Sequence, residues 1–468
     1  MKLISKKVAS IAVALLMLFV VISCTKRTTK SESLASFDLS SSYNITAILD
    51  PENKTLEHTT EVKICNNGQG STGELYFHLY GNLYKTENEG IEIATVTDEK
   101  GKSIPFVLKD DNQLVLLTLG DALGSGEETI ILFTCKVIIP EMANIFGVAR
   151  DGEIHLPFFY PQLAVYDKDG WNTKALAQVG DGRYTEMSDY MITISAPSEY
   201  EIVCNGVELS RVAQDSQTAY VFQAAQRREL FVAAFTDYNH FERIVGNTRI
   251  LGYFHDTPGS LIDMGDMDSV MDAAAFSMEY YNRILMDYPY ETLIVMRSAW
   301  TSHAVNMEYS GLFTIAAMGD ENGEHATYHE MAHQWFYFLV GNNENAEPWL
   351  DEAFAEFASV LCLEAAGYTE VVADRWEFQK TVSYIYMDGE AINVSYDKAS
   401  NYTNLFYNRG AYFLKELMDA IGKDEFLSIL SEYCETYAYR FATTEAFLIL
   451  LRERTPVSID GVIDKYIR

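Results

Sequence analysis

The feature of this sequence that most constrains its fold is a histidine pair, His329 and His333, followed after a gap of eighteen residues by Glu352. Because residues four apart lie one above the other on a helix, a helix here places both imidazoles on one face. Two histidines and a carboxylate are a ligand set typical of Zn²⁺, which keeps a fourth position for water. Glu330 lies about 100° round the helix from His329. It can therefore face the metal-bound water without binding the metal.

The residues around the pair predict two consecutive helices. Residues 324–339 have a strongly apolar face and precede Gly341, a residue typical of a helix end. A second helix begins near Pro348, which suits a first turn, and runs to about Gly367. Glu352 lies in that first turn, so a short connection folds it back onto the first helix. A five-residue pattern with two free positions also occurs by chance, and this context supports the metal site.

The same segment resembles the M1 family of zinc aminopeptidases. The similarity covers the His-Glu-x-x-His pattern, the gap of eighteen residues, and the stretches Gln-Trp-Phe at 334–336 and Trp-Leu-Asp-Glu-Ala-Phe-Ala-Glu at 349–356. The resemblance implies one zinc ion per chain, held by His329, His333 and Glu352. It also implies that Glu330 is the general base of a metallopeptidase.

Upstream of the histidines lies a partial match to a second family motif, Gly-Ala-Met-Glu-Asn. Met307 and Glu308 match it, whereas Val305, Asn306 and Tyr309 depart from it. In the family this glutamate holds the free α-ammonium of the substrate, and a carboxylate in a closed pocket pairs well with an ammonium. The resemblance implies that Glu308 binds substrate. The alternative is a solvated loop carboxylate.

Downstream, residues 407–410 read Tyr-Asn-Arg-Gly and resemble the family pattern Tyr-x-Lys-Gly, with Arg409 in place of lysine. The family's tyrosine donates a hydrogen bond to the developing oxyanion, a role that suits a phenol in a dry site. The resemblance implies that Tyr407 is a catalytic residue. The chain has 30 Tyr, and Tyr402 and Tyr412 are nearby alternatives.

The amino terminus predicts export and a lipid anchor. Three lysines precede an apolar run at 8–22, which is shorter than a typical span of about 20 residues and has the layout of a secretory signal. Residues 21–24, Val-Ile-Ser-Cys, resemble a bacterial lipobox, in which Cys24 receives the lipid. We expect a signal peptide at 1–23, a tether at 24–37 and a protein anchored to the cell membrane on its extracytoplasmic face.

The charge excludes other classes of partner. The chain has a net charge of −32, and loss of residues 1–23, which carry three Lys and no acids, leaves −35. Nucleic-acid binding requires a basic face and is excluded. Electrostatic docking on anionic lipid is disfavoured too, so the membrane contact depends on the lipid anchor. Peptides are the expected substrates, and the sequence does not identify any protein partner.

The chain is predicted to be a multidomain α+β protein. Short alternating segments separated by turn residues predict an antiparallel, β-sandwich-like domain at 38–245. The resemblance implies a thermolysin-like, mostly helical zinc peptidase domain at 246–468. Many family members continue into a large carboxy-terminal helical domain, and this chain does not. The resemblance therefore also implies a zinc cleft that is less enclosed. Residues 159–166 resemble the family's amino-terminal domain, where Gln162 is either a substrate contact or a loop residue.

The cysteines show no Cys-x-x-Cys spacing that would indicate a second metal site. Beyond Cys24 their number is odd, so they cannot all pair internally. Buried free thiols are the default expectation, and the disulfide status is left open. The five cysteines are Cys65, Cys135, Cys204, Cys362 and Cys434.

Three functions remain open at this point. The first is a lipid-anchored aminopeptidase that removes residues from the amino ends of peptides. The second is a zinc endopeptidase, which the departures around Glu308 and the expected open cleft allow. The third is a catalytically idle surface module that keeps the fold for binding. Glu330 and Tyr407 speak against the third, because a structural zinc site needs neither.

Overall fold

The structure, a computed structural model, describes residues 38–85, 87–142, 144–174, 182–255, 267–298, 306–316 and 321–468. The predicted signal peptide, the tether with Cys24, and Val305 lie outside the described residues. Among the helices it describes, none has the length and apolar character needed to cross a bilayer.

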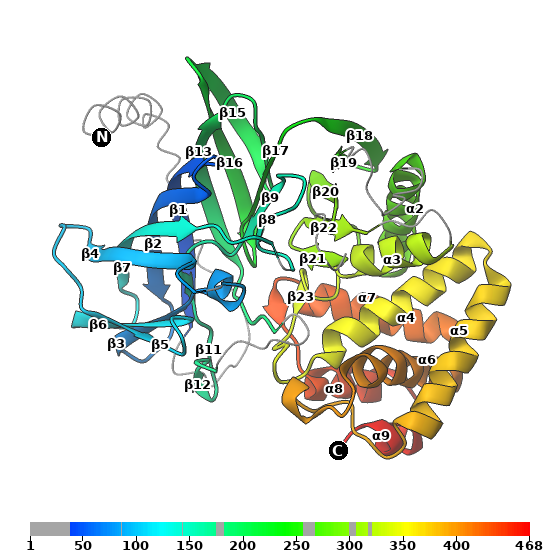
Figure 1. Cartoon of the computed structure of the whole chain (residues 1–468). Helices are drawn as coiled ribbons and strands as arrows, with labels where there is room; N and C mark the ends of the chain where they lie inside the picture. Colours follow the sequence, from blue (N-terminus) through cyan, green and yellow to red (C-terminus); the bar gives the residue numbers. More distant parts are fainter. Residues whose placement is uncertain are drawn as a thin grey trace.

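The first part of the chain is a β-rich domain, as the alternating pattern predicted (Figure 1). Its largest sheet has seven strands in the order β15-β16-β13-β1-β2-β7-β4. In β1 the buried side chains of Tyr43, Ile45, Ala47 and Leu49 alternate with less buried ones, which places one face of the strand in the core. The strands are β1 (Leu39–Asp50), β2 (Thr55–Asn66), β4 (Gly90–Asp98), β7 (Glu128–Ile138), β13 (Ser188–Pro197), β15 (Val207–Gln214) and β16 (Gln217–Arg227).

Two four-stranded sheets and a small hairpin complete this domain, and buried side chains from several sheets form one core. The first sheet has the order β10-β3-β6-β5 and the second β14-β17-β9-β8. The strands are β3 (Thr72–His78), β5 (Phe106–Lys109), β6 (Leu114–Leu123), β8 (Gly147–Val148), β9 (Ile154–Pro157), β10 (Gln162–Leu163), β14 (Glu201–Cys204) and β17 (Phe231–Phe235), with η1 (Tyr80–Leu83) and the hairpin β11 (Tyr166–Asp167) and β12 (Gly170–Trp171).

The second domain starts with a five-stranded sheet in the order β18-β19-β20-β22-β21. Its strands are β18 (Tyr238–Val245), β19 (Thr248–His255), β20 (Thr292–Arg297), β21 (Met307–Tyr309) and β22 (Leu312–Ile315). β18, which lies within the predicted range 38–245, pairs with this second sheet. β18 forms an antiparallel hairpin with β19 through a turn at Gly246, so the sheets divide between Phe235 and Tyr238.

Helices pack against this sheet and form the rest of the second domain (Figure 1). The central one is α4, which is buried from Trp349 to Leu363 and ends at Gly367, where φ is +95°. The elements are α2 (Met267–Ile284), α3 (Glu321–Ala332), β23 (Val340–Gly341), α4 (Trp349–Ala366), α5 (Thr369–Thr381), η2 (Val382–Tyr386), η3 (Tyr396–Lys398), η4 (Thr403–Arg409), α6 (Gly410–Ile421), α7 (Lys423–Tyr437), β24 (Arg440–Phe441), α8 (Thr444–Arg454) and α9 (Asp460–Tyr466).

The helix predicted at 324–339 is shorter than expected, because α3 ends at Ala332. The next residues form turns in which the backbone N–H of Phe338 donates to the carbonyl of His333, 3.0 Å away, and Tyr337 has a φ of +106°. These turns bring β23 beside β24 in a parallel pair. The apolar residues after His333 are buried as predicted, but in turns instead of a helix.

Four cysteines, Cys135, Cys204, Cys362 and Cys434, are free and buried, which agrees with the default expectation. Cys65 departs from it, since it is disulfide-bonded. Gln162 is not in a loop. It lies buried in β10, and its amide nitrogen donates to the hydroxyl of Tyr190 over 3.3 Å.

Candidate active site

Two neighbouring helices bring the three predicted metal ligands together. His333 directly follows α3, and its Nε2 lies 3.0 Å from Nε2 of His329. α3 packs against α4, which carries Glu352. Oε2 of Glu352 lies 3.4 Å from Nε2 of His329 and 3.5 Å from Nε2 of His333. All three side chains are buried.

This triangle fits a zinc ion. Ligand atoms about 2.0–2.1 Å from a tetrahedral Zn²⁺ lie roughly 3.3 Å from one another, close to the spacing observed. Oε2 of Glu352 is buried and has no hydrogen-bond partner within the described residues. A buried carboxylate oxygen without a partner is costly, and a bound cation would satisfy it. The donor set and its geometry therefore suit the metal that the sequence predicted.

A buried carboxylate lies next to Nδ1 of each histidine, on the side of the ring away from Nε2. Asp351 Oδ1 lies 2.7 Å from Nδ1 of His333, which leaves Nε2 of that ring free to bind a metal. Oε2 of Glu356 lies 3.5 Å from Nδ1 of His329 and 3.2 Å from Nε2 of His325. The sequence reasoning missed these partners. Their signal was spacing, because His325 precedes His329 by four residues and Glu356 follows Glu352 by four.

Glu330 lies beside the triangle and outside it. Its Oε2 is buried and has no hydrogen-bond partner in the part of the chain that the structure describes. Glu330, Glu308 and His333 each have a potential ligand atom within 4.8 Å of the other two. Burial raises the pKa of the Glu330 carboxyl to about 8, and the negative charges of Glu308 and Glu352 act in the same direction. The position suits a base that does not bind the metal.

Tyr407 reaches the site from η4. Its hydroxyl donates to Oε1 of Glu352 over 2.5 Å, and its ring stacks on His329 with centroids 5.6 Å apart. This hydrogen bond places the Tyr407 hydroxyl beside Glu352, a predicted metal ligand. Of the two alternatives, the Tyr402 ring stands 6.3 Å from that of Tyr407, and Tyr412 packs on Tyr384 at 5.9 Å.

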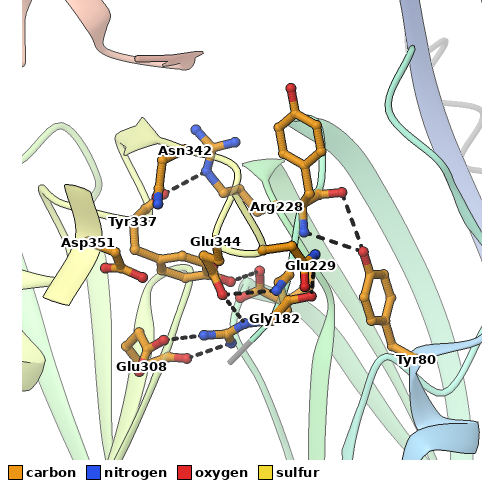
Figure 2. Close-up of polar contacts among 12 residues, drawn as sticks. Tyr80, Gly182, Arg228, Glu229, Glu308, Tyr337, Asn342, Glu344 and Asp351 are labelled. Carbon is orange, nitrogen blue, oxygen red and sulfur yellow. Dashed lines mark hydrogen bonds and ion pairs between the residues drawn. The ribbon is translucent and has the colours of Figure 1, made fainter. Parts of the chain in front are cut away.

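Glu308 is buried in the edge strand β21, so the solvated-loop alternative is wrong. The Arg183 guanidinium donates to its Oε1 and, over 3.1 Å, to its backbone carbonyl. Arg183 also donates its backbone N–H to Oε2 of Glu344 over 2.9 Å. Figure 2 shows Glu308 and Glu344 among the residues of this network. No local sequence pattern points to Arg183, because it is 125 residues from Glu308.

Comparison with known proteins agrees with this site. Residues 269–466 match the peptidase family M1 domain. Aminopeptidase M1-B of Oryza sativa subsp. japonica is 30% identical over 203 residues, which are 41% of this chain and 21% of that protein. Probable aminopeptidase 2 of Sulfurisphaera tokodaii is 22% identical over 435 residues, which are 84% of this chain and 51% of that protein. The chain thus spans about half the length of these relatives or less.

Solved structures show the same two-domain fold. The M1 zinc metallopeptidase of Deinococcus radiodurans superposes with a TM-score of 0.68 at 16% identity, covering 91% of this chain and 92% of its own. A mutant of that protein bound to a Tyr-Ser-Ala substrate gives a TM-score of 0.67 at 16% identity, covering 92% and 94%. At this identity the likeness establishes the fold, which confirms the predicted fold class.

Proposed function

We propose that this protein is a zinc-dependent aminopeptidase that removes residues from the amino ends of peptides. The observation that carries the proposal is the buried triangle of His329, His333 and Glu352, with the carboxylate of Glu330 beside it. The M1 peptidase domain at 269–466 supports the same activity. Burying Oε2 of Glu330 without a hydrogen-bond partner is costly, and a binding module would not require it.

The side chains divide the reaction among them. His329, His333 and Glu352 would hold the zinc ion, which when bound supplies a Lewis acid for water and for the peptide carbonyl. Glu330 accepts the proton of the attacking water and passes it to the leaving amine. Tyr407 stabilises the developing oxyanion once its hydroxyl leaves Glu352.

Glu308 determines which peptide bond is cut in this proposal. Its carboxylate pairs with the substrate's α-ammonium, so that the first peptide bond lies beside Glu330. The closeness of Glu308, Glu330 and His333 supports this assignment, since their potential ligand atoms lie within 4.8 Å of one another.

The test measures metal content and activity together. We expect one zinc per chain by elemental analysis and release of the fluorophore from amino-acid amides. N-acetylated forms of the same amides are the matched control, and they should not be cleaved. Purified protein that binds zinc but leaves every free amino-acid amide intact would contradict the proposal.

One observation favours an endopeptidase as the second candidate. Arg183 already gives Glu308 a cationic partner, so a substrate ammonium is not the only charge available to it. An endopeptidase would cut peptides with blocked amino ends at internal positions. Mass spectrometry of a peptide library digested by the zinc-loaded protein separates the two, because an aminopeptidase produces ladders from the amino end only.

We also propose that lipid on Cys24 anchors the protein at the extracytoplasmic face of the cell membrane. The apolar run at 8–22, the Ser23-Cys24 pair and the polar segment that follows support this. Two or three acyl chains provide stable anchoring where a single chain does not. Mass spectrometry of the mature amino-terminal peptide should find an acylated Cys24. Lipid and a disulfide compete for the same Cys24 thiol, so a Cys24 without lipid, whether free or bonded to Cys65, would contradict the anchor.

A further inference from the structure

Arg183 belongs to the amino-terminal domain, yet its side chain enters the candidate active site. It lies between β12 and β13, and its guanidinium binds both the carboxylate and the backbone carbonyl of Glu308. Arg183 and Glu308 are each 3% exposed. The first domain therefore holds the residue that would bind the substrate ammonium.

A second carboxylate balances the charge of Arg183. Oε2 of Glu344 lies 2.9 Å from the backbone nitrogen of Arg183 and 3.6 Å from its Nε. Glu344 comes from the segment between β23 and α4 and is also 3% exposed. Burial raises the pKa of the Glu344 carboxyl, and the positive charge of Arg183 opposes that rise. With both carboxylates ionised, the three groups together carry a single negative charge. Without Glu344 the positive charge of Arg183 would cancel that of Glu308.

Aromatic rings surround this ion network. The guanidinium carbon of Arg183 lies 4.5 Å from the ring centre of Tyr337, 5.8 Å from that of Phe158 and 5.9 Å from that of Tyr309. Rings of this kind stabilise a cation and keep water away. Charges shielded from water are screened less than exposed ones, so each charge in this network acts on its neighbours.

We propose that Arg183 and Glu344 form a neutral positioning pair that orients Glu308 and leaves its negative charge for the substrate ammonium. This inference rests on the proposed aminopeptidase function. The selectivity for a free amino terminus then depends on Glu344, a residue that does not itself touch the substrate. It also depends on the docking of the amino-terminal domain, which supplies Arg183.

The test compares two zinc-binding probes that differ only in the ammonium group. Leucine hydroxamate carries it, and 4-methylpentanohydroxamic acid lacks it. Calorimetry on zinc-loaded protein gives a dissociation constant for each, and their ratio reports ammonium recognition. Removing one unit charge at about 10 Å, with an effective dielectric constant of about 20, changes affinity by about tenfold. Glu344→Gln should therefore reduce the wild-type preference for leucine hydroxamate by about tenfold, with little change for the other probe.

A double substitution separates charge from structure. Arg183→Gln combined with Glu344→Gln removes one charge of each sign and returns the network to a net negative charge. We expect it to recover most of the preference that Glu344→Gln alone loses. Damage to the fold would instead make the double variant as poor as the single one or poorer.

The control is Glu229→Gln, which changes another buried carboxylate of the interdomain network (Figure 2). The oxygens of Glu229 bind the backbone nitrogen of Ser310 and the hydroxyl of Tyr337, each over 2.5 Å. Because Glu229 binds these neutral donors, whereas Glu344 contacts Arg183, this variant should reduce the preference for leucine hydroxamate less than Glu344→Gln does. A wild-type protein without preference would refute the aminopeptidase and this inference together. A wild-type preference that survives Glu344→Gln, or a double variant no better than the single one, would overturn this inference alone.

Discussion

The contact between Asp351 and His333 allows a quantitative prediction about the metal. Asp351→Asn keeps an oxygen that can accept from Nδ1 of His333 but removes the negative charge. The present contact is 2.7 Å long and both side chains are 1% exposed, so the carboxylate acts on the ring with little screening. Loss of such a partner typically lowers metal affinity 10- to 100-fold, or about 1.4–2.7 kcal/mol.

The structure also predicts which of two carboxylates, Asp351 or Glu356, contributes more to zinc affinity. Glu356 faces the other histidine, but its Oε2 lies 3.5 Å from Nδ1 of His329. The same carboxylate also contacts Nε2 of His325 and accepts a hydrogen bond from Gln379. A longer and shared contact is worth less, so Glu356→Gln should lower zinc affinity less than Asp351→Asn does. It is therefore the matched control for the first variant.

The assay is a competition for zinc between the protein and a fluorescent chelator at constant pH. Circular dichroism of the metal-free variants should show that both remain folded. The reasoning is refuted if Asp351→Asn binds zinc as tightly as the wild type, or if Glu356→Gln loses more affinity than Asp351→Asn.

Three further predictions concern catalysis and stability. Glu330→Gln should keep its zinc while kcat falls by about 10²–10⁴-fold, because the general base is lost, and normal turnover would rule out that role. Tyr407→Phe should lower kcat by about 10²–10³-fold with KM nearly unchanged, whereas Tyr402→Phe should leave kcat unchanged. If the two variants lose the same amount of activity in stopped assays, Tyr407 is not a specific oxyanion donor. Trp349→Ala should lower the free energy of unfolding by about 3–5 kcal/mol, because the side chain is fully buried in α4. Phe378→Ala, at a side chain 57% exposed, should change that free energy by less than about 0.5 kcal/mol, and similar denaturant midpoints for the two would contradict the packing argument.

The sequence could anticipate the parts of the site that depend on local geometry. His329 and His333 share a helical face through their spacing, and Glu352 follows at the start of the next helix. Such relations need only the period of a helix and a short connection. The short alternating segments separated by turn residues likewise predicted the β-rich first domain.

The remainder depends on contacts between distant segments. Arg183 meets Glu308 only because the two domains dock, and no local period relates residues so far apart. The end of α3 at Ala332 depends on pairing between β23 and β24, so the apolar pattern after His333 did not reveal it. The place of β18 likewise depends on pairing, because a hairpin with β19 assigns it to the second sheet.

The central claim is that His329, His333 and Glu352 hold one zinc ion. Anomalous X-ray diffraction of crystals of the purified protein, recorded on both sides of the zinc absorption edge, tests it most directly. We predict one strong anomalous peak about 2.0–2.2 Å from His329 Nε2, His333 Nε2 and Glu352 Oε2. Zinc found only at other side chains, or no peak among these three atoms in zinc-supplemented crystals, would contradict the account.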